Sequence, residues 1–200
     1  MKLLTFKLAG TEYLGALTDT GVFNLSAAAP EDIAFSSMQH FIEAGQLALD
    51  RAYALLESSS ASIPSDQVDF LAPLPLPPQI RDCLGFEEHL KNSFESAMKL
   101  SAMAADDPVV AERELRASGR FTVPEVWYQQ PLYYKANRFS VAESGKDVVW
   151  PAYSEVMDFE LEMACIVGKK GKDISKVNAE DHIFGYTIYN DFSARDAQIL

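Results

Sequence analysis

Apolar and polar positions alternate in short runs over residues 2–25, and the pairs Gly10-Thr11 and Asp19-Thr20 separate these runs. Alternation at a period of two, with turn residues between the runs, predicts a small antiparallel meander. Helical spacing follows over residues 38–44 and is stronger over residues 47–56. The chain therefore begins with a compact set of strands followed by helices.

A Ser/Ala-rich link over residues 58–65 leads to the proline-rich run 71–78. Proline lacks a backbone N–H and breaks a helix interior, so this run is predicted to be an extended connector. We place the boundary of a small N-terminal domain here. The predicted division is residues 1–70 and residues 71–200.

The second part of the chain mixes helical and strand-like patterns. Residues 87–120 have helical spacing that Pro108 interrupts, and a glycine- and lysine-rich turn is expected at 168–172. Strands are predicted at 148–150, 156–167 and 183–189, and a short helix at 174–182. The local pattern alone indicates a mixed β domain with helical insertions.

Composition narrows the class of protein. The 200 residues have 48% hydrophobic content and a formal net charge of −12, which argues against partners such as nucleic acid and anionic membrane surfaces. No run of about eighteen apolar residues is present, so we expect no transmembrane helix. The only cysteines, Cys83 and Cys165, form neither a metal-ligand spacing nor a redox pair. This is typical of a reduced, cytoplasmic protein.

The most informative stretch is Asp158-Phe159-Glu160-Leu161-Glu162. On a strand, alternation places its three carboxylates on one face, with the Cβ atoms of neighbouring members about 6.6 Å apart. Such a row can converge on a hard divalent cation, because Mg²⁺ and Ca²⁺ bind carboxylate oxygens. The alternative is a solvated acidic face with a nearby lysine partner, which is the commoner origin of such a pattern.

A second polar cluster, Asn190 to Gln198, follows the predicted strand 183–189. Ser193 and Asp196 have the spacing of a capping box, which predicts a helix beginning near Ser193. Arg195 and Gln198 would then share one helix face, next to Asp191 at the strand end. Arginine can hold a carboxylate through two hydrogen bonds, so this segment suits an oxygen-rich anion. A helix-capping Asp191 and a surface arginine are the alternative.

His89 is a candidate general base, because the nearby carboxylates of Asp82 and Glu88 could orient its ring and raise its basicity. A single histidine is more often a surface or core residue. Tyr134 ends a Pro-Leu-Tyr-Tyr segment. A tyrosine in such a segment is ordinarily a buried aromatic residue, and the alternative is a phenol that points into the site.

Three features together resemble the fumarylacetoacetate hydrolase family over roughly residues 70–200. They are the seven-residue spacing of Asp82 and His89, the segment Asp158–Met163, and the segment His182–Gln198. Its Asn-Asp-x-Ser-Ala-Arg-Asp-x-Gln pattern is the most specific part. The resemblance implies an α+β architecture in which a small N-terminal domain precedes a mixed β-roll catalytic domain of fumarylacetoacetase type. It also implies that the roll continues beyond Leu200, so that residues 71–200 form its N-terminal portion.

The resemblance further implies a set of site residues. Asp82, Glu160, Glu162 and Asp191 would coordinate Mg²⁺, or Ca²⁺ or Mn²⁺ in its place, and His89 would activate a water molecule. The residues in contact with substrate would be Tyr134, Arg195 and Gln198.

The function that the resemblance implies is hydrolysis of a carbon–carbon bond in a 1,3-diketo acid or acylpyruvate-like substrate, by a homodimer. One alternative is a 2-oxo acid decarboxylase, hydratase or isomerase of the same superfamily. An alternative of another class is a non-catalytic fragment or binding protein. Product formation from an acylpyruvate and from oxaloacetate separates the first two, and the intact mass of the natural product tests the third.

Overall fold

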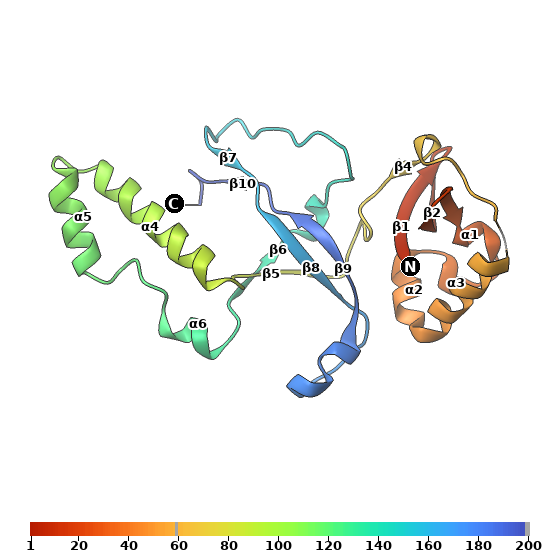
Figure 1. Ribbon diagram of the computed structural model, residues 1–200. Helices are drawn as coiled ribbons and strands as arrows, with labels where there is room; N and C mark the ends of the chain where they lie inside the picture. Colours follow the sequence, from red (N-terminus) through yellow and green to blue (C-terminus); the bar gives the residue numbers. More distant parts are fainter. Residues whose placement is uncertain (59, 199–200) are drawn as a thin grey trace. The chain divides into compact units, whose positions relative to one another are not determined.

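The structure is a computed structural model that describes residues 1–58 and 60–198 (Figure 1). Its contacts form two compact units, and each is considered by itself. The first unit combines residues 1–77 with residues 139–200, and the second is residues 78–138. The change of unit after residue 77 falls in the expected connector, but the chain returns to the first unit at residue 139. The division into residues 1–70 and 71–200 therefore stays a prediction.

The N-terminal meander is confirmed as a four-stranded antiparallel sheet with the order β3-β2-β1-β4. Its strands are β1 (Lys2–Leu8), β2 (Thr11–Thr18), β3 (Gly21–Asn24) and β4 (Asp69–Phe70). The edge strand β3 also forms an isolated bridge between Val22 and Ile63. Gly21 has φ +140°, and a Cβ there would lie 2.3 Å from the carbonyl oxygen of Ile63. Only glycine permits this close approach of the segment at residue 21 to the segment at Ile63.

Helices pack on this sheet and close the N-terminal core. They are α1 (Leu25–Ala28), α2 (Met38–Ala44) and α3 (Gln46–Ser58), with the 3-10 turns η1 (Ile33–Phe35) and η2 (Ser65–Gln67). Both helical predictions in this region are confirmed. Ser37 begins α2 because its hydroxyl accepts a hydrogen bond from the backbone N–H of His40.

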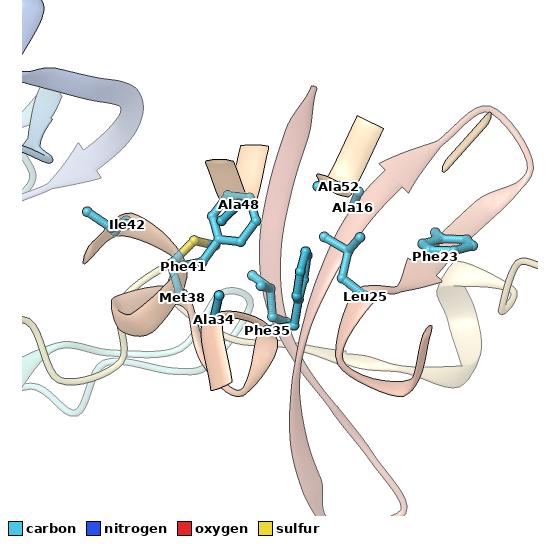
Figure 2. Close-up of a cluster of buried hydrophobic side chains, with 11 residues drawn as sticks. Ala16, Phe23, Leu25, Ala34, Phe35, Met38, Phe41, Ile42, Ala48 and Ala52 are labelled. Carbon is cyan, nitrogen blue, oxygen red and sulfur yellow. The ribbon is translucent and has the colours of Figure 1, made fainter. Parts of the chain in front are cut away.

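Two phenylalanines dominate the core that lies between the sheet and the helices (Figure 2). Phe35 and Phe41 are fully buried and meet edge to face, with ring centroids 5.6 Å apart. Each buried side chain of this size contributes about 1.5–3 kcal/mol of hydrophobic stabilisation. Phe184, from the C-terminal part of the chain, meets Phe41 edge to face at 6.1 Å. The N-terminal core thus extends onto a strand that lies between Glu162 and Asp191 in the sequence.

The second unit is a helical segment carried by one strand pair. Strands β5 (Ile80–Cys83) and β6 (Tyr133–Ala136) are antiparallel, and between them lie α4 (Glu87–Met103), α5 (Pro108–Ala117) and α6 (Glu125–Gln129). Pro108 interrupts the helical pattern as predicted, and Asp107 caps α5 by accepting from two backbone N–H groups. Arg116 of α5 donates two hydrogen bonds to Glu95 of α4, so these helices lie side by side (Figure 1).

The C-terminal part of the first unit is built on a long hairpin. Strand β8 (Leu161–Val167) pairs with β9 (Ile183–Asn190), and the short strand β7 (Met157–Asp158) pairs with β10 (Ser193–Ala194). The predicted strands 156–167 and 183–189 are therefore confirmed. The remaining turns are η3 (Arg138–Ser140), η4 (Lys176–Asn178) and η5 (Glu180–His182).

Two local predictions are wrong. No strand forms over residues 148–150, where the indole N–H of Trp150 instead donates to the backbone oxygen of Ser154. The predicted helix 174–182 is a pair of 3-10 turns, η4 and η5. In both places a local bond replaces the repeating pattern that the apolar spacing indicated.

One face of the β8–β9 hairpin is apolar and exposed. Leu161, Met163 and Val167 of β8 and Tyr186 and Ile188 of β9 are each more than half exposed. Ile188 lies directly opposite Met163 in the register. None of the described helices combines the length and the apolar character that a membrane span requires.

Candidate metal and substrate site

Backbone pairing in the C-terminal hairpin places three of the four predicted carboxylate ligands on one face. The backbones of Glu160 and Asp191 exchange two hydrogen bonds, with N···O distances of 3.1 and 3.0 Å. Residues that exchange both bonds in an antiparallel ladder are directly opposed, and their side chains lie on the same face. Glu162, two residues further along, shares that face. Three of the predicted metal ligands therefore occupy one side of one hairpin.

The same register continues toward the start of the hairpin. Asp158 is paired with Ser193, and Leu161 is paired with Asn190. The predicted row of Asp158, Glu160 and Glu162 on one face is thus confirmed by the backbone pairing. The row is less exposed than the opposite face, because Glu160 and Glu162 are half-buried whereas Phe159, Leu161 and Met163 are exposed.

Arg195 lies directly against this row. Its Nε atom donates to Oδ2 of Asp158 at 2.9 Å, and its Nη2 atom lies 2.9 Å from the same oxygen. Its Nη1 atom donates to Oε1 of Glu160 and, at 3.1 Å, to Oε1 of Gln198. The predicted proximity of Arg195 and Gln198 is therefore observed.

The charge of this cluster is reflected in its pKa values. The pKa of Asp158 is lowered because the backbone N–H of Phe159 and the guanidinium of Arg195 donate to its carboxylate. Partial burial by itself would lower the pKa of Arg195, but the hydrogen bonds that Arg195 donates to Glu160 and Asp158 outweigh it and raise the pKa. Both carboxylates are therefore paired with a cation that stays protonated.

The segment that carries Arg195 is a turn rather than the predicted helix. Ser193 and Ala194 pair with β7, and the backbone N–H groups of Ala197 and Gln198 both donate to the carbonyl of Ala194. The side chain of Ser193 donates to the backbone oxygen of Asp191 and does not cap a helix. The prediction of a helix beginning near Ser193 is wrong within the described residues. Its continuation to Leu200 lies outside them.

Asp196 is a residue whose role the capping-box interpretation missed. Its carboxylate accepts from the hydroxyl of Ser154 at 2.6 Å and from the backbone N–H of Glu155 at 2.8 Å. Both bonds lower the pKa of Asp196. The two contacts join segments about forty residues apart and fix the turn that presents Arg195. The sequence contains no local signal for this pairing, because it depends on the register of β7 with β10.

Asp82 and Tyr134 meet in the second unit. They are partners in the register of β5 with β6, and the hydroxyl of Tyr134 donates to Oδ2 of Asp82 at 2.9 Å. Asp82 is only 8% exposed, so this charge-assisted bond matters for the stability of the strand pair. Asp82 is therefore bonded to Tyr134, whereas one interpretation of the sequence had paired it with His89.

His89 lies in the first turn of α4 and is exposed. Among the described residues, no hydrogen bond or ion pair engages its imidazole ring. An open cavity of about 350 Å³ lies in the same unit, between residues 83–85 and residues 127–132. The indole N–H of Trp127 donates to the carbonyl of Leu84 at 2.6 Å and fixes one wall of this cavity.

The candidate ligands fit a divalent cation in their chemistry but not in their present positions. The oxygen donors of Glu160, Glu162 and Asp191 have the right chemistry and share a face, which suits a hard cation. Within the described residues, however, no three carboxylate, imidazole or thiol groups lie close enough together to ligate one ion. The carboxylate of Glu160 is instead bound to Arg195. The assignment of these three residues, and of Asp82, as ligands stays a prediction.

Comparison with known proteins places this geometry in a family. A family model described as the fumarylacetoacetate (FAA) hydrolase C-terminal domain matches residues 86–199, which include His89, Glu160 and Asp191. The chain belongs to the fumarylacetoacetate hydrolase family. The resemblance seen in the sequence is confirmed, and so is a fold that mixes helices and strands in the manner of this family.

Relatives in this family catalyse more than one reaction. The chain is 29% identical to the human mitochondrial oxaloacetate tautomerase FAHD2A, over 100% of its own length and 55% of the human protein. It is 43% identical to a fumarylacetoacetase of Oryza sativa subsp. japonica over 89 residues, which cover 36% of this chain and 21% of the rice protein. The chain thus spans about half the length of the human relative.

A solved structure is similar in fold. A maleylpyruvate hydrolase from Sphingobium sp. SYK-6, in complex with manganese(II) ion and pyruvate, superposes with a TM-score of 0.61 and 19% identity. The match covers 98% of this chain and 60% of that chain. The small N-terminal domain and the continuation of the β-roll stay predictions.

Proposed function

We propose that this protein is a divalent-cation-dependent enzyme that hydrolyses a carbon–carbon bond in a 1,3-diketo acid or acylpyruvate-like acid. The observation that carries the proposal is the direct opposition of Glu160 and Asp191, on a face shared with Glu162 and beside Arg195. A carboxylate face next to a guanidinium suits a substrate that brings both a chelating oxygen pair and an anionic group. The manganese and pyruvate bound to the related Sphingobium hydrolase support a cation and a 2-oxo acid.

In this proposal, Glu160, Glu162 and Asp191 hold the cation, and Asp82 is a fourth ligand. When bound, the cation supplies Lewis acidity toward the oxygens of a 2-oxo acid. Arg195 donates to the carboxylate of the substrate, and the amide of Gln198 donates to a carbonyl or carboxylate oxygen. These two side chains orient the substrate on the hairpin face.

His89 and Tyr134 supply the remaining chemistry. The imidazole of His89 takes a proton from water, and the resulting hydroxide attacks the carbonyl carbon of the acyl group. The carbon–carbon electron pair leaves with the 2-oxo acid fragment, which then recovers a proton from the imidazolium. The hydroxyl of Tyr134 contacts the substrate, and the buried carboxylate of Asp82 orients that hydroxyl.

Keto–enol tautomerisation of oxaloacetate is a second candidate reaction. The human oxaloacetate tautomerase matches the whole of this chain, whereas the rice fumarylacetoacetase matches about a third of it. Tautomerisation needs proton transfer next to a polarised carbonyl and no attack by water. Both reactions therefore need the carboxylate face to hold the cation that polarises the carbonyl. Only hydrolysis needs His89 to activate a water molecule.

The cation site is tested by calorimetric titration of the full chain with Mn²⁺ and Mg²⁺. Glu160→Gln, Glu162→Gln and Asp191→Asn each remove one formal charge, and each should weaken binding about tenfold or more. Glu180→Gln is the matched control, because it removes the same charge from an exposed 3-10 turn and should leave affinity unchanged. Equal affinity in all four variants would show that the row is only a solvated face.

The reaction is tested separately with acetylpyruvate and with oxaloacetate, each with Mn²⁺ and with a chelator. Pyruvate and acetate released from acetylpyruvate would support hydrolysis, and faster enol–keto exchange of oxaloacetate alone would support the second candidate. Cation binding without either activity would reject both reactions while leaving the site intact. It would favour a binding protein.

A further inference from the structure

Arg195 divides its guanidinium between two carboxylates of different exposure. Two nitrogens, Nε and Nη2, contact the same oxygen of Asp158, whose side chain is 47% exposed. The third nitrogen, Nη1, contacts Glu160, whose side chain is 21% exposed. The guanidinium is thus anchored at the outer carboxylate and reaches the inner one with a single nitrogen.

The inner contact falls on the residue that the proposed cation site requires. Glu160 opposes Asp191 and shares a face with Asp158 and Glu162, so four carboxylates lie on this side of the hairpin. Like charges at this spacing repel one another unless a positive charge offsets them. The Nη1 end of Arg195 provides that positive charge in the structure described here.

We propose that Arg195 is a built-in counter-ion of the carboxylate face, which holds Glu160 until a divalent cation displaces it and remains anchored on Asp158 afterwards. This inference rests on the cation site of the proposed function. A divalent cation on this face competes with Nη1 for the carboxylate of Glu160 and repels the guanidinium, so occupancy of the site by the cation favours release of Nη1. The released nitrogen is then available to the carboxylate of a substrate. The arrangement therefore orders binding, with the cation before the substrate.

The two carboxylates have different parts in this device. Asp158 contacts neither cation nor substrate and acts as a positioning residue. It keeps the guanidinium of Arg195 in place when the contact between Nη1 and Glu160 is lost. The contacts of Nε and Nη2 with Asp158 hold one edge of the guanidinium. Nη1 can then move away from Glu160 only by rotation of the guanidinium about that edge. Gln198 accepts from the same Nη1 atom and provides a second resting partner for it.

The test follows the side-chain nitrogens of Arg195 by NMR while the full chain is titrated with Mg²⁺. Arg195→Lys assigns the resonances by their disappearance. We expect the Nη resonances of Arg195 to shift or broaden as the site fills, while the Nε–H resonance keeps the shift and slow exchange of a group bound to Asp158. Glu160→Gln without Mg²⁺ should already show the released Nη pattern.

Calorimetry gives an independent readout. Arg195→Lys keeps the positive charge but lacks the fork that joins both carboxylates, so Mn²⁺ should bind about three- to tenfold more tightly than to the unmodified chain. Arg51→Lys is the matched control, because Arg51 forms an ion pair with Asp32 in the N-terminal part of the chain. It should leave the affinity for Mn²⁺ unchanged.

Each outcome decides the question. Equal affinity of Arg195→Lys and the unmodified chain, or saturation with Mg²⁺ and no change in the Nη resonances, would overturn the counter-ion role and leave the cation site standing. Absence of binding in both chains would overturn the site and the counter-ion role together. Binding only after Arg195→Lys would support the counter-ion role most strongly. If the lysine variant does not fold, the Nη pattern of Glu160→Gln decides alone.

Discussion

Replacing Phe41 with alanine tests whether the N-terminal core supports the hairpin that carries the carboxylate face. Phe41 is fully buried and meets Phe35 and Phe184 edge to face. Phe→Ala substitutions in cores cost about 3–5 kcal/mol, and each ring pair accounts for about 0.5–1.5 kcal/mol of such interactions. We therefore expect a loss of about 4 kcal/mol. This is a large share of the about 5–15 kcal/mol by which a folded domain is stable.

Urea unfolding followed by circular dichroism measures this loss. Phe41→Leu keeps most of the side-chain volume and should cost less than about 1.5 kcal/mol. Leu47→Ala is the control for an apolar residue of α3 that is 76% exposed, and it should be nearly neutral. A double-mutant cycle with Phe184→Leu should give a coupling of about 0.5–1.5 kcal/mol between the rings. A cost near that of Leu47→Ala, or no coupling to Phe184, would refute this reasoning.

The remaining predictions concern the site and the exposed face. His89→Ala should leave the affinity for Mn²⁺ unchanged and abolish hydrolysis in an acetylpyruvate assay, and a loss of binding would show that His89 is a ligand. Asp196→Asn should destabilise the chain above the ordinary carboxyl range of about pH 4, because hydrogen bonds from Ser154 lower the pKa of folded Asp196. The difference from the unmodified chain in thermal melts should disappear as pH falls through that lowered pKa, and a difference that grows instead would contradict the assignment. Met163→Lys with Ile188→Lys should reduce self-association in sedimentation experiments, because both residues are more than 70% exposed on one apolar face. Association that is equal with and without these lysines would exclude that face as its cause.

The sequence predicted those elements whose pattern is repeated over many residues. The N-terminal meander, the helices α2 to α4 and the strands β8 and β9 all have regular apolar spacing, and each was found. The row Asp158, Glu160 and Glu162 was also predictable, because alternation on a strand is a local property. The pairing of this row with Asp191 followed only from the resemblance to a family.

The failed predictions have two physical causes. A local bond from Trp150 to Ser154 decides the run 148–150, whereas long-range bonds decide the segment at Ser193. Ser193 pairs with Asp158, and Asp196 accepts from Ser154, so neither side chain is available to begin a helix. The contact of Arg195 with Glu160 was likewise hidden, because it depends on the register of two strands that sequence periodicity leaves open.

The strand pair β5–β6 makes the segment between its two strands an insertion. Ile80 opposes Ala136 at its base, and beyond Cys83 the backbone N–H of Leu84 donates to the carbonyl of Leu132 at 3.0 Å, so the inserted segment enters and leaves through neighbouring residues. Its length can therefore change without disturbing the bond between Asp82 and Tyr134. The proposed base His89 lies inside the insertion, whereas the proposed cation ligands Glu160, Glu162 and Asp191 lie outside it. In the proposed function, exchange of this segment would therefore replace the proposed base while the proposed cation ligands on the hairpin are retained, which gives one proposed cation site a direct route to several reactions.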